Sequence, residues 1–145
     1  YGSEMRGGTA TCSVNISNDP IDSPMILNPT VLIVMNTPSL VKFESGVKAG
    51  GKLIINSSLV EKEPVRTDLE MYKVPFNDLA TEAGNERGMN MLVAGVYAAI
   101  SGFITLENLY TAIEHAFEGN KAKFIPGNKA MAKFGYDYGM EHFGK

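Results

Sequence analysis

The residues best suited to ligand chemistry stand at the start of the chain, where Arg6 is followed directly by Gly7, Gly8 and Thr9. A guanidinium presents a planar fork of donors that matches a phosphate group. Glycine has no Cβ, so its backbone can approach a ligand closely and turn its amides outward. This spacing predicts an anion site, although Arg-Gly-Gly is also typical of a plain surface turn.

Two asparagines are candidates for the same site because each follows a short apolar run. Asn36 comes after residues 31–35, and Asn56 comes after residues 53–55. If both runs are neighbouring parallel strands, their carboxyl ends meet where open α/β sheets bind ligands. The alternative is that Asn simply ends each strand, because it is a common turn residue.

We find no self-contained catalytic set and no metal set in the sequence. His115 and His142 are the two histidines, and neither stands at ligand spacing from Cys12 or from the other. One cysteine cannot hold an iron–sulfur cluster, which takes about four thiolates. We therefore expect this chain to supply neither a catalytic residue nor a metal ligand.

Composition limits the class of protein. The chain has 145 residues, 44% of them hydrophobic, and a net charge of −3. This length predicts a single domain spanning 1–145. The acidic balance and scattered lysines argue against nucleic-acid binding, and no apolar run is long enough for a membrane span. With one cysteine and no signal peptide at its start, the chain is expected in the cytoplasm.

The elements around the candidate site are predicted from periodicity. Strict alternation over 9–17 predicts a half-buried strand, and the prolines of 18–30 predict turns. The unbroken apolar run at 31–35 is typical of a strand covered on both faces and is our candidate for the central strand. Thr37 is predicted to cap a short helix ending near Glu44. A return turn at 50–51 then leads to the strand at 53–55, which gives a right-handed parallel crossover.

The second half is predicted to be mainly helical. We expect an edge strand at 69–74, a helix capped by Asn77, and an apolar helix within 89–104. Thr105 is predicted to cap an amphipathic helix closed by Gly119. The tail, 120–145, is predicted to hold a helix at 128–134 and an irregular stretch at 135–139, and its aromatic residues favour contact with a partner.

The opening segment also resembles a known family. Its string Tyr-Gly-Ser-Glu-Met-Arg-Gly-Gly at 1–8 is similar to the Tyr-Gly-Pro-Glu-x-Arg-Gly-Gly signature of the gamma subunits of 2-oxoacid:ferredoxin oxidoreductases. Ser3 stands where the family usually has proline. The similarity covers most of residues 1–118. Further segments that follow in the family's order are 16–21, 36–40, 50–53 and 56–58.

This resemblance implies a fold and a function. The fold would be a Rossmann-like, three-layer α/β unit with a mostly parallel sheet, lacking the N-terminal strand and the Gly-x-Gly-Gly-x-Gly loop of the family. The function would be that of a gamma subunit, inactive alone, in an enzyme that converts a 2-oxoacid to acyl-CoA and reduces ferredoxin. Coenzyme A would be bound by Arg6, Gly7, Gly8 and Thr9 together with Asn36 and Asn56.

The resemblance places the remaining chemistry on other chains. Thiamine diphosphate, magnesium and iron–sulfur clusters would belong to alpha and beta subunits and to a ferredoxin-like delta subunit. Branched-chain 2-oxoacid, 2-oxoglutarate and pyruvate all stay open as substrates, with the first two favoured. Two other hypotheses are a structural interaction subunit without ligand contacts and a free-standing dinucleotide-binding module. The latter lacks the G-x-G-x-x-G turn that it requires.

Overall fold

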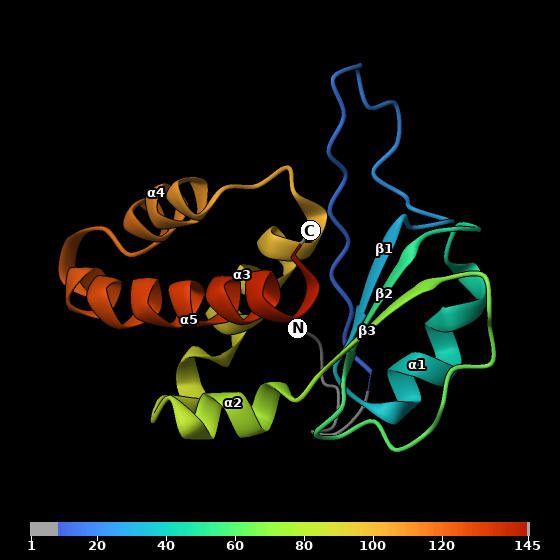
Figure 1. The fold of residues 1–145 in the computed structure, drawn as a ribbon. Coiled ribbons are helices and arrows are strands. Elements are labelled where there is room, and N and C mark those ends of the chain that lie inside the picture. Colours follow the sequence, from blue (N-terminus) through green and yellow to red (C-terminus); the bar gives the residue numbers. More distant parts are fainter. Residues whose placement is uncertain (1–8, 145) are drawn as a thin grey trace. The chain divides into compact units, whose positions relative to one another are not determined.

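The structure is a computed structural model of the 145-residue chain, and it describes residues 9–144. The chain divides into two compact units, Tyr1–Val74 and Pro75–Lys145. Figure 1 shows strands in the first unit and helices in the second. An α/β chain with a parallel sheet is as predicted.

The sheet of the first unit has three parallel strands in the order β1-β2-β3. β1 spans Val31–Val34, β2 spans Lys52–Asn56 and β3 spans Glu70–Val74. Val31 pairs with Lys52, and Lys52 pairs with Glu70, so the strands run in one direction with their carboxyl ends together. β2 is therefore central, and the prediction that residues 31–35 form the central strand is wrong for the part of the sheet described.

The core of this unit lies between the sheet and α1, which spans Thr37–Phe43 and continues as the 3₁₀ turn η1, Glu44–Gly46. Leu40 of α1 is fully buried in a cluster of apolar side chains from the strands and the loops that follow them. The buried members are Val34, Leu40, Val47, Leu53, Ile55 and Leu69. Each such side chain contributes about 1.5–3 kcal/mol on burial, which fixes α1 on the sheet.

The cap of α1 differs from the prediction. Asn36, not Thr37, is the N-cap: its backbone is extended and its Oδ1 accepts a hydrogen bond from the Ser39 amide at 3.0 Å. Asn caps at least as well as Thr. The Thr37 hydroxyl is then available to the loop after β2, where it donates to the Leu59 carbonyl at 3.4 Å.

The strand predicted at 9–17 does not form. Residues 9–27, which we call the arm, run out and back without helix or strand (Figure 1). Within the described residues, no main-chain hydrogen bond joins the arm to another main-chain group. Val14 and Ile16 are 70% and 68% exposed. Alternation sorts side chains onto two faces, but a strand also needs a neighbour to bond, and the arm has none here. Residues 18–30 bend repeatedly and form neither helix nor strand, which agrees with the prediction that regular structure is interrupted there.

Arg66 ties the loop between β2 and β3 to the end of α1. Its guanidinium donates to the carbonyl oxygens of Glu44 and Val47, and its amide donates to the buried Glu44 carboxylate at 2.7 Å. The same guanidinium donates to both carboxylate oxygens of Asp68. These hydrogen bonds lower the pKa of the Asp68 carboxyl. The loop is thus held by one side chain that bonds at several points.

Over its described residues, 75–144, the second unit contains helices and no strand. α2 spans Phe76–Glu82, the 3₁₀ turn η2 spans Glu86–Gly88, and α3 spans Met89–Ser101. α4 spans Leu106–Ala116, the 3₁₀ turn η3 spans Gly119–Phe124, and α5 spans Ile125–Phe143. The predicted cap at Thr105 is confirmed as a capping box with Asn108. The predicted cap at Asn77 is wrong, because α2 begins before it and follows Pro75.

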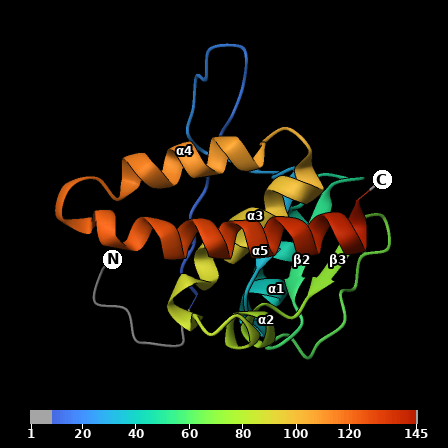
Figure 2. The same cartoon turned by 60° about the vertical axis from the view of Figure 1, so that its left-hand side comes forward.

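α5 is longer than predicted and runs without interruption through residues 135–139. It lies beside α3 (Figure 2). A Cβ on Gly135 would lie 2.9 Å from the Leu92 carbonyl carbon, and one on Gly95 would lie 2.7 Å from the Tyr136 amide nitrogen. Both distances are shorter than real contacts, so the two helices touch backbone to backbone. Glycines that weaken a helix in isolation are here required by its packing, and the tail packs within its own chain.

Substituting Gly135→Ala should destabilise the second unit by about 1–3 kcal/mol, because the new methyl group would push α3 and α5 apart. The matched control is Gly127→Ala in the same helix, where the nearest atom to a new Cβ is 3.9 Å away. That control should be neutral or stabilising. Urea unfolding followed by far-UV circular dichroism measures both; equal stability of the two variants would contradict the close helix contact.

Asp68 should make a pH-dependent contribution to the stability of the first unit. Its folded-state pKa is lowered by Arg66, so the pair stabilises the fold above the unfolded value of about 3.9. This stabilisation is lost as pH falls through the folded-state pKa. The stability difference between wild type and Asp68→Asn should therefore shrink on acidification. Urea unfolding midpoints between pH 6 and 2 measure this stability difference, and Asp22→Asn in the exposed arm is the control. If the difference between wild type and Asp68→Asn stayed constant over this pH range, the role assigned to Asp68 would be wrong.

Candidate functional site

The carboxyl ends of β1 and β2 are joined by the side chain of Asn56. This residue is fully buried, at 0% exposure. Its Nδ2 donates to the carbonyl oxygen of Met35 at 3.1 Å, and its Oδ1 accepts from the Ser58 amide at 3.3 Å. The structure therefore brings the Asn36 and Asn56 regions together as predicted. Asn56 itself does not reach the surface, so a direct ligand contact from its side chain does not fit this geometry.

Asn36 is the more accessible of the two. It is half-buried at the junction of β1 and α1, and its Oδ1 is occupied by the Ser39 amide. Its Nδ2 is thus the atom that can donate to a ligand. A carboxamide donor of this kind is suited to phosphate or carbonyl oxygens.

A second polar contact connects the same two segments. Besides donating to Leu59, the Thr37 hydroxyl accepts a hydrogen bond from the Glu61 amide at 3.3 Å. The loop at 57–61 also folds onto β2 and β3, because the Ser57 amide donates to the Val74 carbonyl at 2.9 Å. The loop after β2 is consequently fixed against the start of α1. Thr37 was interpreted from the sequence only as a cap, so this role was missed.

Thr9 is the first described residue of the opening segment; Arg6, Gly7 and Gly8 lie outside the described residues. The Thr9 hydroxyl accepts a hydrogen bond from the Lys42 ammonium of α1 at 3.4 Å. The structure therefore places Thr9 beside a cation of α1. Sequence reasoning also missed Lys42. Nothing in the sequence pattern pointed to this lysine.

The opposite end of the sheet carries a separate polar cluster. Glu70 accepts hydrogen bonds from the Lys52 ammonium and from the Tyr72 hydroxyl, the latter at 2.9 Å. The hydrogen bond to Glu70 raises the pKa of Lys52, and partial burial raises the pKa of Tyr72. Neither shift brings a proton into the neutral range. Lys52 opens β2 whereas Asn56 closes it, about 13 Å away at the rise of a strand, so this cluster is not part of the candidate site.

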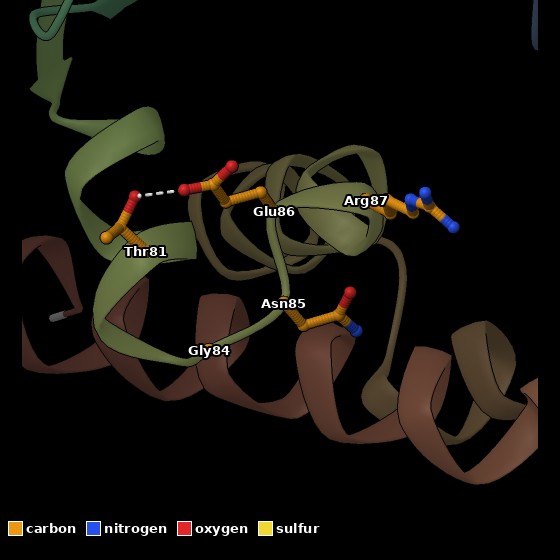
Figure 3. A pocket seen from close by; sticks show the side chains of 5 residues that line it. All are labelled: Thr81, Gly84, Asn85, Glu86 and Arg87. Carbon is orange, nitrogen blue, oxygen red and sulfur yellow. Dashed lines mark hydrogen bonds between the residues drawn. The ribbon is translucent and has the colours of Figure 1, made fainter.

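The second unit has a hollow of about 400 Å³ in the turn between α2 and α3. Figure 3 shows the residues that line it: Thr81, Gly84, Asn85, Glu86 and Arg87. Two of its polar groups serve the turn itself. The Thr81 hydroxyl donates to Glu86 at 3.0 Å, and Asn85 accepts from the Gly88 amide at 3.1 Å. Sequence reasoning gave no signal for this hollow, and we interpret it as a feature of the turn.

Among residues 9–144, no cluster of three or more histidine, cysteine or acidic side chains could hold a metal ion. Among the same residues, no helix has the length and apolar character that a membrane crossing requires.

Comparison with solved structures gives the fold. The gamma subunit of a keto/oxoacid ferredoxin oxidoreductase from Geobacter sulfurreducens PCA matches with a TM-score of 0.67 at 21% identity, over 77% of this chain and 64% of that one. A 2-oxoglutarate:ferredoxin oxidoreductase from Magnetococcus marinus, solved with 2-oxoglutarate, coenzyme A and succinyl-CoA bound, matches with a TM-score of 0.59 at 18% identity. That match covers 77% of this chain and 19% of that one. The α/β fold of gamma subunits is thereby confirmed.

Comparison with curated sequences gives the relatives. The ketoisovalerate oxidoreductase subunit VorA of Methanothermobacter marburgensis is 33% identical over 144 residues, which is 98% of this chain and 30% of VorA. The 2-oxoglutarate synthase subunit KorC of Methanocaldococcus jannaschii is 30% identical over 115 residues, which is 78% of this chain and 62% of KorC. This chain thus spans less than two thirds of the length of either relative. The family pattern described as "Pyruvate ferredoxin/flavodoxin oxidoreductase" matches residues 1–138, and we conclude that the chain belongs to this family.

Proposed function

We propose that this chain acts as the gamma part of a 2-oxoacid:ferredoxin oxidoreductase, where it helps to bind coenzyme A and to assemble the complex. Family membership and gamma-subunit fold support this proposal. The single observation that carries the ligand role is the joining of two parallel strand ends by Asn56, which forms the kind of edge where open α/β sheets receive ligands.

The donors near this edge fit a phosphorylated carrier. Asn36 offers a carboxamide nitrogen, and Lys42 brings a cation beside Thr9. Arg6, Gly7 and Gly8 precede Thr9 directly in the sequence and would add a guanidinium and free amides. Phosphate oxygens are well matched by such a set of donors. We propose that Arg6, Gly7, Gly8, Thr9 and Asn36 contact coenzyme A directly. Asn56 would support these contacts from its buried position without touching the ligand.

The role of these residues would be to bind and orient the carrier. Coenzyme A supplies the thiol that accepts the acyl group, and a fixed geometry lowers the barrier to such a transfer. No proton transfer is assigned to this chain, because the polar side chains around Asn36 are already engaged in structural hydrogen bonds. Thiamine diphosphate, magnesium and iron–sulfur clusters would reside on alpha, beta and delta partners, and ferredoxin would accept the electrons of the assembled enzyme.

The identity of the 2-oxoacid would be set by those partners. The names of the two relatives refer to different oxoacids, ketoisovalerate and 2-oxoglutarate, although this chain is 33% and 30% identical to them. A domain shared by both enzymes is a poor place to choose between their substrates. We propose further that 1–145 works as one α/β domain, since the family match crosses the boundary at Val74 without a break. We also propose that it works in the cytoplasm, which suits a chain with one cysteine.

Reconstitution tests the proposal as a whole. The chain, expressed in its full-length natural form, should restore acyl-CoA formation and ferredoxin reduction when it is mixed with its alpha and beta partners. Each preparation alone should be inactive. Full activity of the partners without it would overturn the proposed function.

Substituting Arg6→Ala should raise the half-saturating concentration of coenzyme A by about tenfold to a hundredfold, because a charge-assisted hydrogen bond to phosphate contributes about 1.5–3 kcal/mol. Initial rates at varied coenzyme A measure this effect in the assembled enzyme. The matched control is Arg87→Ala, which removes an exposed guanidinium from the second unit and should change nothing.

The same variant separates a ligand role from a structural one. Thiamine-dependent decarboxylation of the 2-oxoacid should stay nearly intact in Arg6→Ala, since that step precedes acyl transfer. Equal loss of decarboxylation and acyl transfer would instead favour the purely structural interaction subunit.

A further inference from the structure

We infer that Asn56 is a positioning residue for coenzyme A binding, acting on Asn36 through the carbonyl group of Met35 without touching the ligand. This inference rests on the proposed function and assigns a different part to a residue that the sequence predicts as a direct contact. It starts from burial: Asn56 has 0% exposure, and both ends of its carboxamide are hydrogen-bonded.

The coupling to Asn36 runs through one peptide unit. The carbonyl of Met35 and the amide nitrogen of Asn36 belong to the same planar group. When Asn56 Nδ2 donates to Met35 O at 3.1 Å, it fixes the plane of that peptide and with it the direction in which Asn36 leaves the strand. Asn36 then caps α1 through Ser39 at 3.0 Å, so its Nδ2 is held at a defined place.

Thr37 makes the second half of the same support. Its hydroxyl donates to the Leu59 carbonyl at 3.4 Å and accepts from the Glu61 amide at 3.3 Å. Hydrogen bonds therefore hold the chain on both sides of Asn36. Asn56 bonds the residue before it, Met35, and the loop at 57–61 bonds the residue after it, Thr37. We call Asn56 and Thr37 the strand-end brace. Loss of either member should let Asn36 move while the core of the unit stays packed.

The neutral carboxamide of Asn56 makes Asp, which is similar in shape, the informative replacement. Asp has the same shape but, when ionised, cannot donate to Met35 O. In the reconstituted enzyme, Asn56→Asp should raise the half-saturating concentration of coenzyme A by about tenfold, comparable to the loss of one hydrogen bond to a ligand. The turnover number at saturating coenzyme A should change less than twofold by the same reasoning. A merely structural role would lower the amount of active enzyme and leave half-saturation unchanged.

Thr37→Val provides a milder test, because valine keeps the shape and removes only the hydroxyl. It should raise half-saturation by a few-fold, in line with weaker hydrogen bonds between neutral groups. The matched control is Thr81→Val in the second unit, which deletes a hydroxyl that donates to Glu86 at 3.0 Å. This control should leave coenzyme A binding unchanged. If Asn56→Asp fails to assemble, Asn56→Ala, which removes the hydrogen bond to Met35 without adding a charge, takes its place in the test.

A double-mutant cycle shows whether the brace acts through Asn36. Asn36→Ser keeps a capping oxygen for α1 but removes the carboxamide donor. In that background, Asn56→Asp and Thr37→Val should each add almost nothing to the coenzyme A requirement, because residues acting through one another are not additive. Full additivity would overturn the inference, as would unchanged half-saturation in both brace variants. If Arg6→Ala is also without effect, the proposed function itself fails; if Arg6→Ala acts alone, only the brace is wrong.

Discussion

The pairing of β1 with β2 is the constraint on which the first unit depends. Its parallel register puts Val34 opposite Ile55, so Met35 and Asn56 end at the same level. That coincidence is what lets a side chain of one strand bond the main chain of the other. A shift of one residue would turn Asn56 toward the opposite face of the sheet. The strand register that packs the core therefore also sets the geometry of the candidate site.

Much of this architecture was predictable because it depends on residues that are close together in the sequence. The unbroken apolar runs gave β1 and β2, and Gly50 with positive φ marks the return turn between them. The N-cap at Thr105 was predicted from residue type alone, whereas the reciprocal bond from Asn108 was not. In each case the signal and the structure lie within a few residues of each other, so no knowledge of tertiary contacts was needed.

The errors arose where a distant contact outweighs local preference. Residues 135–139 contain two glycines and were predicted to be irregular, yet they are helical because α3 packs directly on their backbone. Thr37 was predicted as a helix cap, but its hydroxyl instead donates a hydrogen bond to the carbonyl oxygen of Leu59, some twenty residues away. For the site, residue identity predicted Asn36 and Asn56 correctly as neighbours. Burial, which a sequence does not display, separates the fully buried Asn56 from the half-buried Asn36.

The open conformation of the arm bears on how readily proteases cleave this chain. Between Thr9 and Leu27 the peptide groups make no main-chain bonds within the described residues, and Asp19 and Asp22 are the sole charges. Endopeptidases bind their substrates as open, extended chain, and exposed segments of this kind are where they cut first. The arm, which contributes no side chain to the core cluster of the first unit, is therefore the part of the isolated chain most open to proteolytic cleavage.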